Sequence, residues 1–107
     1  MMKKTVFRKL VRDRIPEMIE QAGQTCSYSV LSDEDYLEML DEKLNEELAE
    51  YQESKSMEEL ADLLEVMKAV AIARGSSPGE VEEIRRLKAD QRGGFEKKIF
   101  LEEVIQP

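Results

Sequence analysis

Residues 47–62 read ELAEYQESKSMEELAD, and this stretch decides the fold. Helix-forming residues fill both of its ends, and Ser56 begins a capping-box pattern in the second half. The polar residues 52–55 between them allow only a short turn. We therefore expect two antiparallel helices joined as a hairpin.

Each helix of this hairpin carries two acids three positions apart, a spacing that places both on one helical face. Glu47 and Glu50 form one pair, and Glu59 and Asp62 form the other. The pairs are equally distant from the turn, so at about 1.5 Å of rise per residue Glu50 lies level with Glu59, and Glu47 with Asp62. Four clustered carboxylates repel one another unless a cation binds, and oxygen ligands favour Mg²⁺ or Mn²⁺. A solvated acidic face is the alternative.

Hydrophobic spacing and capping residues predict a mostly helical chain. The predicted helices cover about residues 14–23, 33–53, 57–75 and 78–93, with Asp13 capping the first. Strand-like composition predicts short strands at residues 5–10, 27–31 and 95–105. The expected fold class is all-α, a helical hairpin in a four-helix-type bundle with short terminal strands, in one domain over residues 1–107.

The second hairpin helix, from Ser56 to Arg74, is apolar over most of its circumference. One partner helix covers only part of such a surface. The sequence therefore predicts a homo-oligomer, either a dimer or a larger even assembly, in which a second copy completes the bundle.

The composition excludes several kinds of chemistry. The chain has no histidine, one cysteine and a formal net charge of −8. Histidine bases, Ser-His or Cys-His nucleophile pairs and histidine-ligated zinc are therefore excluded. The acidic balance argues against nucleic-acid binding, and no apolar run is long enough to span a membrane. The lone Cys26 and the absence of a secretory signal pattern lead us to expect a cytoplasmic protein.

Basic residues gather at the two ends of the sequence and flank its acidic middle. Twelve of the sixteen lysines and arginines lie before Ile15 or after Ile84. This arrangement suits a metal–polyphosphate ligand, although basic ends that only neutralise an acidic middle are the simpler explanation. The candidates for binding substrate phosphate are Lys43, Lys88, Arg92 and Arg12.

Three of these candidates also have a structural explanation. Lys43 stands four residues before Glu47 and either contacts phosphate or forms a helical ion pair. Lys88 and Arg92 share one helical face, but basic residues are also favoured near a helix C-terminus.

The acidic hairpin resembles a known signature. Residues 43–50, KLNEELAE, followed by ELAD at 59–62, closely resemble the E-x-x-E … E-x-x-D signature of the MazG-like, all-α nucleoside triphosphate pyrophosphohydrolases. That superfamily includes phosphoribosyl-ATP pyrophosphohydrolases and dimeric dUTPases. LVRDRIP at 10–16 and RGGF at 92–95 look like the start and end of a compact house-cleaning subgroup. The resemblance covers nearly the whole chain, although the gap between the two acid pairs is shorter than in most of the superfamily.

The resemblance implies a single MazG-like domain that hydrolyses a nucleoside triphosphate, canonical or non-canonical, to the monophosphate and pyrophosphate. It implies that Glu47, Glu50, Glu59 and Asp62 hold Mg²⁺, with Mn²⁺ as a substitute. Either Glu47 or Glu50 is the expected general base. The alternatives are a non-catalytic acidic helical module that binds metal or a protein partner, and a structural helical dimer without a ligand.

Overall fold

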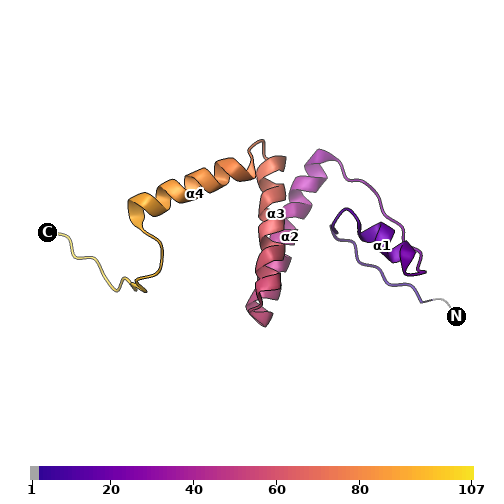
Figure 1. Ribbon diagram of the computed structural model, residues 1–107, viewed down its shortest axis with the longest axis horizontal. Helices are drawn as coiled ribbons and strands as arrows, with labels where there is room; N and C mark the ends of the chain where they lie inside the picture. Colours follow the sequence, from indigo (N-terminus) through magenta and orange to yellow (C-terminus); the bar gives the residue numbers. More distant parts are fainter. Residues whose placement is uncertain (1–2) are drawn as a thin grey trace.

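The computed structural model describes residues 3–107, so of the predicted domain over residues 1–107 only Met1 and Met2 lie outside it. The described chain is all-helical and contains no strand (Figure 1). Its four helices are α1 (Ile15–Gln21), α2 (Asp33–Ser54), α3 (Met57–Ala73) and α4 (Pro78–Arg92).

The α2–α3 hairpin forms the centre of the molecule. Ser32 caps α2 by accepting the Asp35 N–H at 3.2 Å, and Ser56 caps α3 by accepting the Glu59 N–H at 3.3 Å. Between the two helices Lys55 adopts a left-handed conformation with a φ of 58°, which reverses the chain in a very short turn. The predicted antiparallel hairpin is therefore present, and Leu40 and Ala71 are buried at its interface.

The other two helices extend away from the hairpin. Ser77 caps α4, whose backbone approaches α3 near the connecting turn before the helix projects outward (Figure 1). α1 is not closely packed against any of the other three described helices. In the described residues, α1 and the segment before it lie on one side of the hairpin, and α4 and the segment after it lie on the other (Figure 1), so residues 3–107 of one chain do not close the predicted four-helix-type bundle.

The described chain is elongated. Its radius of gyration is 19.2 Å and its extents are 72 × 31 × 24 Å, whereas a compact domain of this length has a radius of gyration of about 13 Å. Its accessible surface of 10149 Å² exceeds that of a compact monomer of this mass by about 4,000 Å². Most apolar side chains outside the hairpin interface therefore remain in contact with solvent.

Two local predictions differ from the structure. The predicted strands at 5–10, 27–31 and 95–105 are absent from the described residues, because these segments find no neighbouring backbone with which to form a ladder. Asp13 does not cap α1, since the cap position is Arg14 and no side chain accepts a hydrogen bond there. A backbone bond from Ile15 N–H to the Arg12 carbonyl, 3.0 Å long, forms that turn instead.

None of the helices within residues 3–107 combines the length and the apolar character needed to cross a bilayer.

Candidate metal and phosphate site

Acids from both hairpin helices converge at one point. Glu47 of α2 and Glu59 and Asp62 of α3 each offer a carboxylate oxygen, and these oxygens lie within 4.8 Å of one another. Ligand oxygens at about 2.1 Å from one Mg²⁺ lie roughly 3.0–4.2 Å apart, so a slight closing of this group would fit the ion. We call Glu47, Glu59 and Asp62 the carboxylate cluster.

The fourth predicted ligand, Glu50, lies beside the cluster instead of within it. Glu50 forms a second group with Glu46 and Glu47, whose carboxylate oxygens also lie within 4.8 Å of one another, and Glu50 is exposed. Glu47 therefore belongs to both groups and links the predicted acid pairs. The mirrored register brought Glu47 opposite Asp62, whereas Glu50 turns along α2 toward its own neighbours.

Glu47 is buried to an unusual degree for an acid. Its exposed fraction is 7%, which places it with Leu40 and Ala71 as the buried residues of the described chain. Lys43 Nζ lies 3.4 Å from Glu47 Oε1, but nothing in residues 3–107 donates a hydrogen bond to Glu47 Oε2. A buried polar atom without a partner costs about 1–3 kcal/mol. The position of this oxygen therefore lowers the free energy of unfolding of the ligand-free protein.

A second oxygen of the cluster, Glu59 Oε2, is also buried and lacks a partner within the described residues. In a complete capping box the glutamate side chain would bond back to the N–H of the capping residue. Here the Ser56 N–H donates to Ser54 Oγ at 3.2 Å instead. The Glu59 carboxylate is thereby available to the cluster, at a helix N-terminus that favours negative charge.

The pKa values of the adjacent acids Glu46 and Glu47 move in opposite directions. Burial and the neighbouring Glu50 carboxylate raise the pKa of Glu47, and the opposing effect of Lys43 is smaller. Partial burial alone would raise the pKa of Glu46, but Lys9 and Lys43 together lower it below its ordinary value. The nearby lysines therefore compensate the negative charge of Glu46 more fully than that of Glu47.

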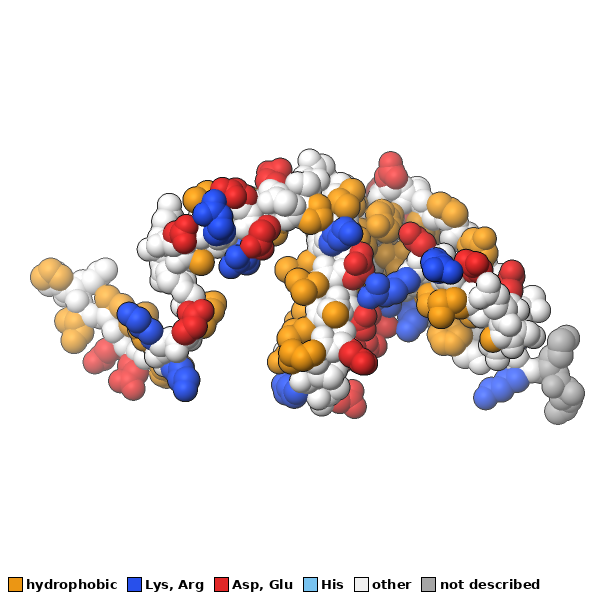
Figure 2. All heavy atoms as spheres, viewed as in Figure 1, with side chains coloured by type: hydrophobic (Ala, Val, Ile, Leu, Met, Phe, Trp, Pro, Cys, Tyr) orange, Lys and Arg blue, Asp and Glu red, His pale blue; other side chains and the backbone are white. Residues whose placement is uncertain are grey.

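Three basic side chains surround the acids of the hairpin. Lys43 lies 3.3 Å from Glu46 and 3.4 Å from Glu47, so its ion pair with Glu47 is formed and the lysine stands beside the cluster. From outside the hairpin, Lys9 donates to Glu46 at 3.1 Å and Arg12 donates to Asp62 at 2.8 Å. Figure 2 shows acidic and basic side chains meeting where the hairpin faces the N-terminal segment.

The structure does not bring Lys88 and Arg92 to the cluster of their own chain. Both belong to the C-terminal half of α4, which extends away from the middle of the hairpin (Figure 1). They line an open hollow of about 790 Å³ together with Gly93, Gly94 and Phe95. Lys88 and Arg92 could therefore serve only the carboxylate cluster of another copy of the chain.

Two residues near the cluster were missed from the sequence. Glu46 shares a face with Glu50 at a spacing of four, a signal that was present in the sequence. Lys9 is 37 positions from Glu46, and no local spacing indicates a contact over that separation.

Comparisons with known proteins leave the family open. No family model matches the chain, and no solved structure matches it. A curated protein of Mycolicibacterium smegmatis, described as an uncharacterized protein, is 55% identical over 42 residues. That segment covers 39% of this chain and 43% of the relative, so the likeness spans less than half of either protein.

Proposed function

We propose that this chain is a magnesium-dependent nucleotide pyrophosphohydrolase, which converts a nucleoside triphosphate to the monophosphate and pyrophosphate. The observation that carries the proposal is a pair of buried carboxylate oxygens, Glu47 Oε2 and Glu59 Oε2, which lie beside Asp62 and have no hydrogen-bond partner within residues 3–107. A protein accepts such a cost where a ligand removes it, and carboxylate oxygens are the ligands that Mg²⁺ prefers. The resemblance of the hairpin to the MazG-like signature supports the choice of reaction.

We assign the residues near the cluster to three roles: binding the metal, accepting a proton from water, and binding phosphate. Glu47, Glu59 and Asp62 hold the metal, and Glu50 lies next to Glu47 on the exposed side. When bound, Mg²⁺ supplies charge neutralisation at the phosphates and polarises the attacking water. Glu50 accepts the proton of that water, because its exposed carboxylate is the acid near the cluster least enclosed by protein. Lys43 and Arg12 contact the phosphates.

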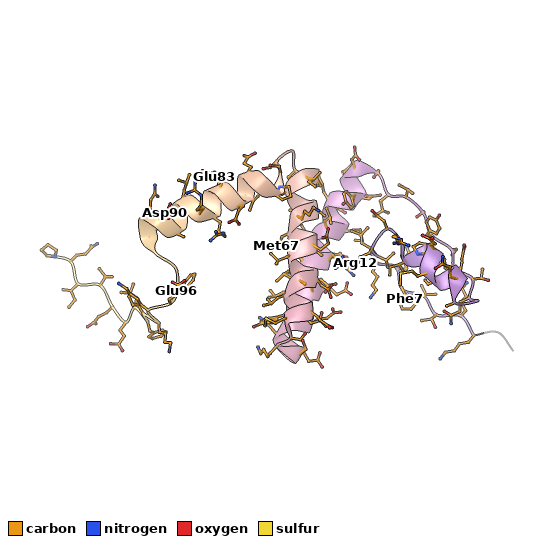
Figure 3. The ribbon with its side chains drawn as sticks, in the orientation of Figure 1. Phe7, Arg12, Met67, Glu83, Asp90 and Glu96 are labelled. Atoms are coloured by element: carbon orange, nitrogen blue, oxygen red, sulfur yellow. The ribbon has the colours of Figure 1, made fainter. Side chains whose placement is uncertain are left out.

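The proposed assembly is a homodimer or a larger even oligomer. Its support is the surface of about 4,000 Å² per chain beyond that of a compact monomer, which exceeds the roughly 1,000–2,500 Å² per partner that obligate homodimers commonly bury. Apolar side chains project from the face of α3 opposite α2, where Figure 2 shows a hydrophobic patch and Figure 3 labels Met67. The exposed large hydrophobic residues of α3 are Met57, Leu64, Met67 and Ile72.

Sedimentation at micromolar concentration tests the assembly. We expect a species of at least twice the chain mass of 12.4 kDa, because the apolar face of α3 would otherwise remain in water. A single species of 12.4 kDa would contradict it.

Pyrophosphate release from a panel of canonical and modified nucleoside triphosphates tests the reaction. We expect release with Mg²⁺ or Mn²⁺, little with Ca²⁺, and none in excess chelator, because compact octahedral coordination suits the phosphates. Release that persists in chelator would overturn the metal assignment. Magnesium binding without release from any nucleotide would favour the non-catalytic metal-binding module, and no metal binding would favour a structural helical dimer or a module that binds a protein partner.

A further inference from the structure

The segment before α1 is held to the hairpin by two ion pairs. Lys9 Nζ donates to Glu46 at 3.1 Å, and Arg12 Nη2 donates to Asp62 Oδ1 at 2.8 Å. The Arg12 carbonyl accepts the Ile15 N–H, which anchors the backbone of Arg12 in the turn that precedes α1. α1 is not closely packed on another described helix, and the two ion pairs hold the segment with Arg12 beside the hairpin (Figure 3).

Arg12 stands where a divalent cation would meet Asp62. Its guanidinium contacts an oxygen of Asp62, whose side chain is 41% exposed. The buried oxygens Glu47 Oε2 and Glu59 Oε2 are reached neither by Arg12 nor by any other donor in residues 3–107. Arg12 therefore neutralises the Asp62 side of the cluster, and Lys43 pairs with Glu47 Oε1. The two buried Oε2 atoms are left without a partner in residues 3–107.

We propose that Arg12 and a divalent cation compete for Asp62, and that the displaced guanidinium binds a phosphate of the substrate. This inference rests on the proposed magnesium site. Arginine stays charged at every working pH and cannot lose its proton to make room. A guanidinium within about 4 Å of Mg²⁺ would be repelled by roughly 2 kcal/mol even at the dielectric constant of water, so the side chain must move.

The surroundings of Arg12 allow that movement. Its side chain is 57% exposed, so it can turn into solvent without opening the hairpin. The planar guanidinium forms paired hydrogen bonds with phosphate oxygens. A phosphate that takes up Arg12 also frees Asp62 for the metal, so metal and triphosphate are expected to assist each other's binding.

Calorimetric titration with MgCl₂ alone tests the competition. Arg12→Gln removes the competing charge and should bind Mg²⁺ at least about fivefold more tightly than the parent. Arg14→Gln is the matched control, because Arg14 is 79% exposed and pairs with Glu17 of α1. It removes the same charge two positions away and should change Mg²⁺ affinity by less than about twofold.

Inorganic triphosphate, titrated at saturating Mg²⁺, tests the second half of the proposal. Arg12→Gln should bind it about tenfold more weakly than the parent, because a charge-assisted contact is lost, and Arg14→Gln should bind it as the parent does. One substitution that strengthens metal binding and weakens phosphate binding is not explained by a merely structural arginine.

The possible results separate this inference from the proposed function. If neither the parent nor Arg12→Gln binds Mg²⁺, the metal site and the competition both fail. If Asp62→Asn abolishes Mg²⁺ binding while Arg12→Gln matches Arg14→Gln, the site stands and the competition is overturned. If Arg12→Gln binds triphosphate as the parent does, the transfer to phosphate is overturned.

Discussion

The α2–α3 hairpin and α4 both carry acids at helical spacing, but they compensate the charge differently. On α4, Glu83 pairs with Arg86 at 2.7 Å, and more than half of each side chain is exposed. On the hairpin, Glu47 and Glu59 each bury an oxygen that no donor within residues 3–107 reaches. An acid whose oxygens are all reached by solvent or a nearby arginine needs no ligand, whereas a buried carboxylate oxygen without a partner is stabilised by one.

The pKa values follow the same division. The hydrogen bonds from Arg85 lower the pKa of Glu82 on α4, so that acid stays ionised more readily than usual. Burial and Glu50 raise the pKa of Glu47 on the hairpin. Charge density alone does not separate the two regions, but the partners of each acid do.

The largest expected contrast between the regions is in catalysis. Glu59→Gln should lower the rate of pyrophosphate release at least about 100-fold, because removal of a metal ligand costs more than removal of a supporting residue. Glu83→Gln on α4 removes the same charge and should keep the parental rate. Parental turnover in Glu59→Gln would remove the distinction between the two acidic regions.

A smaller contrast is expected in the stability of the metal-free protein. Glu47→Gln replaces a buried charge with a neutral group of the same shape and should raise the free energy of unfolding at pH 7 by about 1–2 kcal/mol. Added Mg²⁺ should then raise the melting temperature of the parent and leave that of the variant nearly unchanged. A variant less stable than its parent in chelator would show that Glu47 serves the hairpin interface instead.

The pH dependence of stability should distinguish Glu47 from its neighbour Glu46. Folding raises the pKa of Glu47. Its stabilising contribution to the free energy of unfolding is therefore complete below the unfolded pKa of 4.5 and is lost as pH rises through the folded pKa. Folding lowers the pKa of Glu46. Its stabilising contribution to the free energy of unfolding is therefore present above the unfolded pKa of 4.5 and is lost as pH falls through the folded pKa.

Urea unfolding in chelator, measured from pH 4 upward in about half-unit steps, tests this difference. Glu47→Gln should lessen the decline of stability above pH 4.5, while Glu46→Gln should lower stability at pH 7 by less than about 1 kcal/mol. If both substitutions changed the free energy of unfolding at pH 7 in the same direction, the opposite pKa shifts of Glu46 and Glu47 would be contradicted.

The smallest effect is expected on α4. Glu83→Gln breaks an exposed pair within one helix and should change the free energy of unfolding by less than about 0.5 kcal/mol. A loss several times larger would show that the α4 pairs are buried in an assembly, because enclosure of an ion pair raises the cost of breaking it.

The helices and the hairpin were predictable from the sequence to within a few residues. The serines at positions 32, 56 and 77 cap α2, α3 and α4, and the capping-box pattern had indicated the cap at Ser56. The predicted strands failed because strand composition does not provide a partner, and the described chain offers none to these segments. Asp13 failed as a cap because a backbone turn already begins α1.

The candidate site was predictable only in part. The equal distance from the turn placed Glu47 opposite Asp62, since helical rise alone sets that register. It did not separate Glu50 from the cluster, because the direction of a side chain around the helix depends on its neighbours. The sequence also did not show that Lys88 and Arg92 lie away from the site, because spacing within a helix does not determine the angle between α3 and α4.

The sequence by itself determined the helices, the hairpin and the level of the four acids along it, because these depend on caps, turn length and the constant rise of a helix. Only the tertiary structure decided that Glu47 is buried, with an Oε2 atom that no donor in residues 3–107 reaches, while Lys9 pairs with the adjacent Glu46. Only the tertiary structure brought Arg12 to Asp62, fifty positions away. Burial and long-range charge pairing depend on how distant segments meet in space, and residue spacing within a single helix does not encode that.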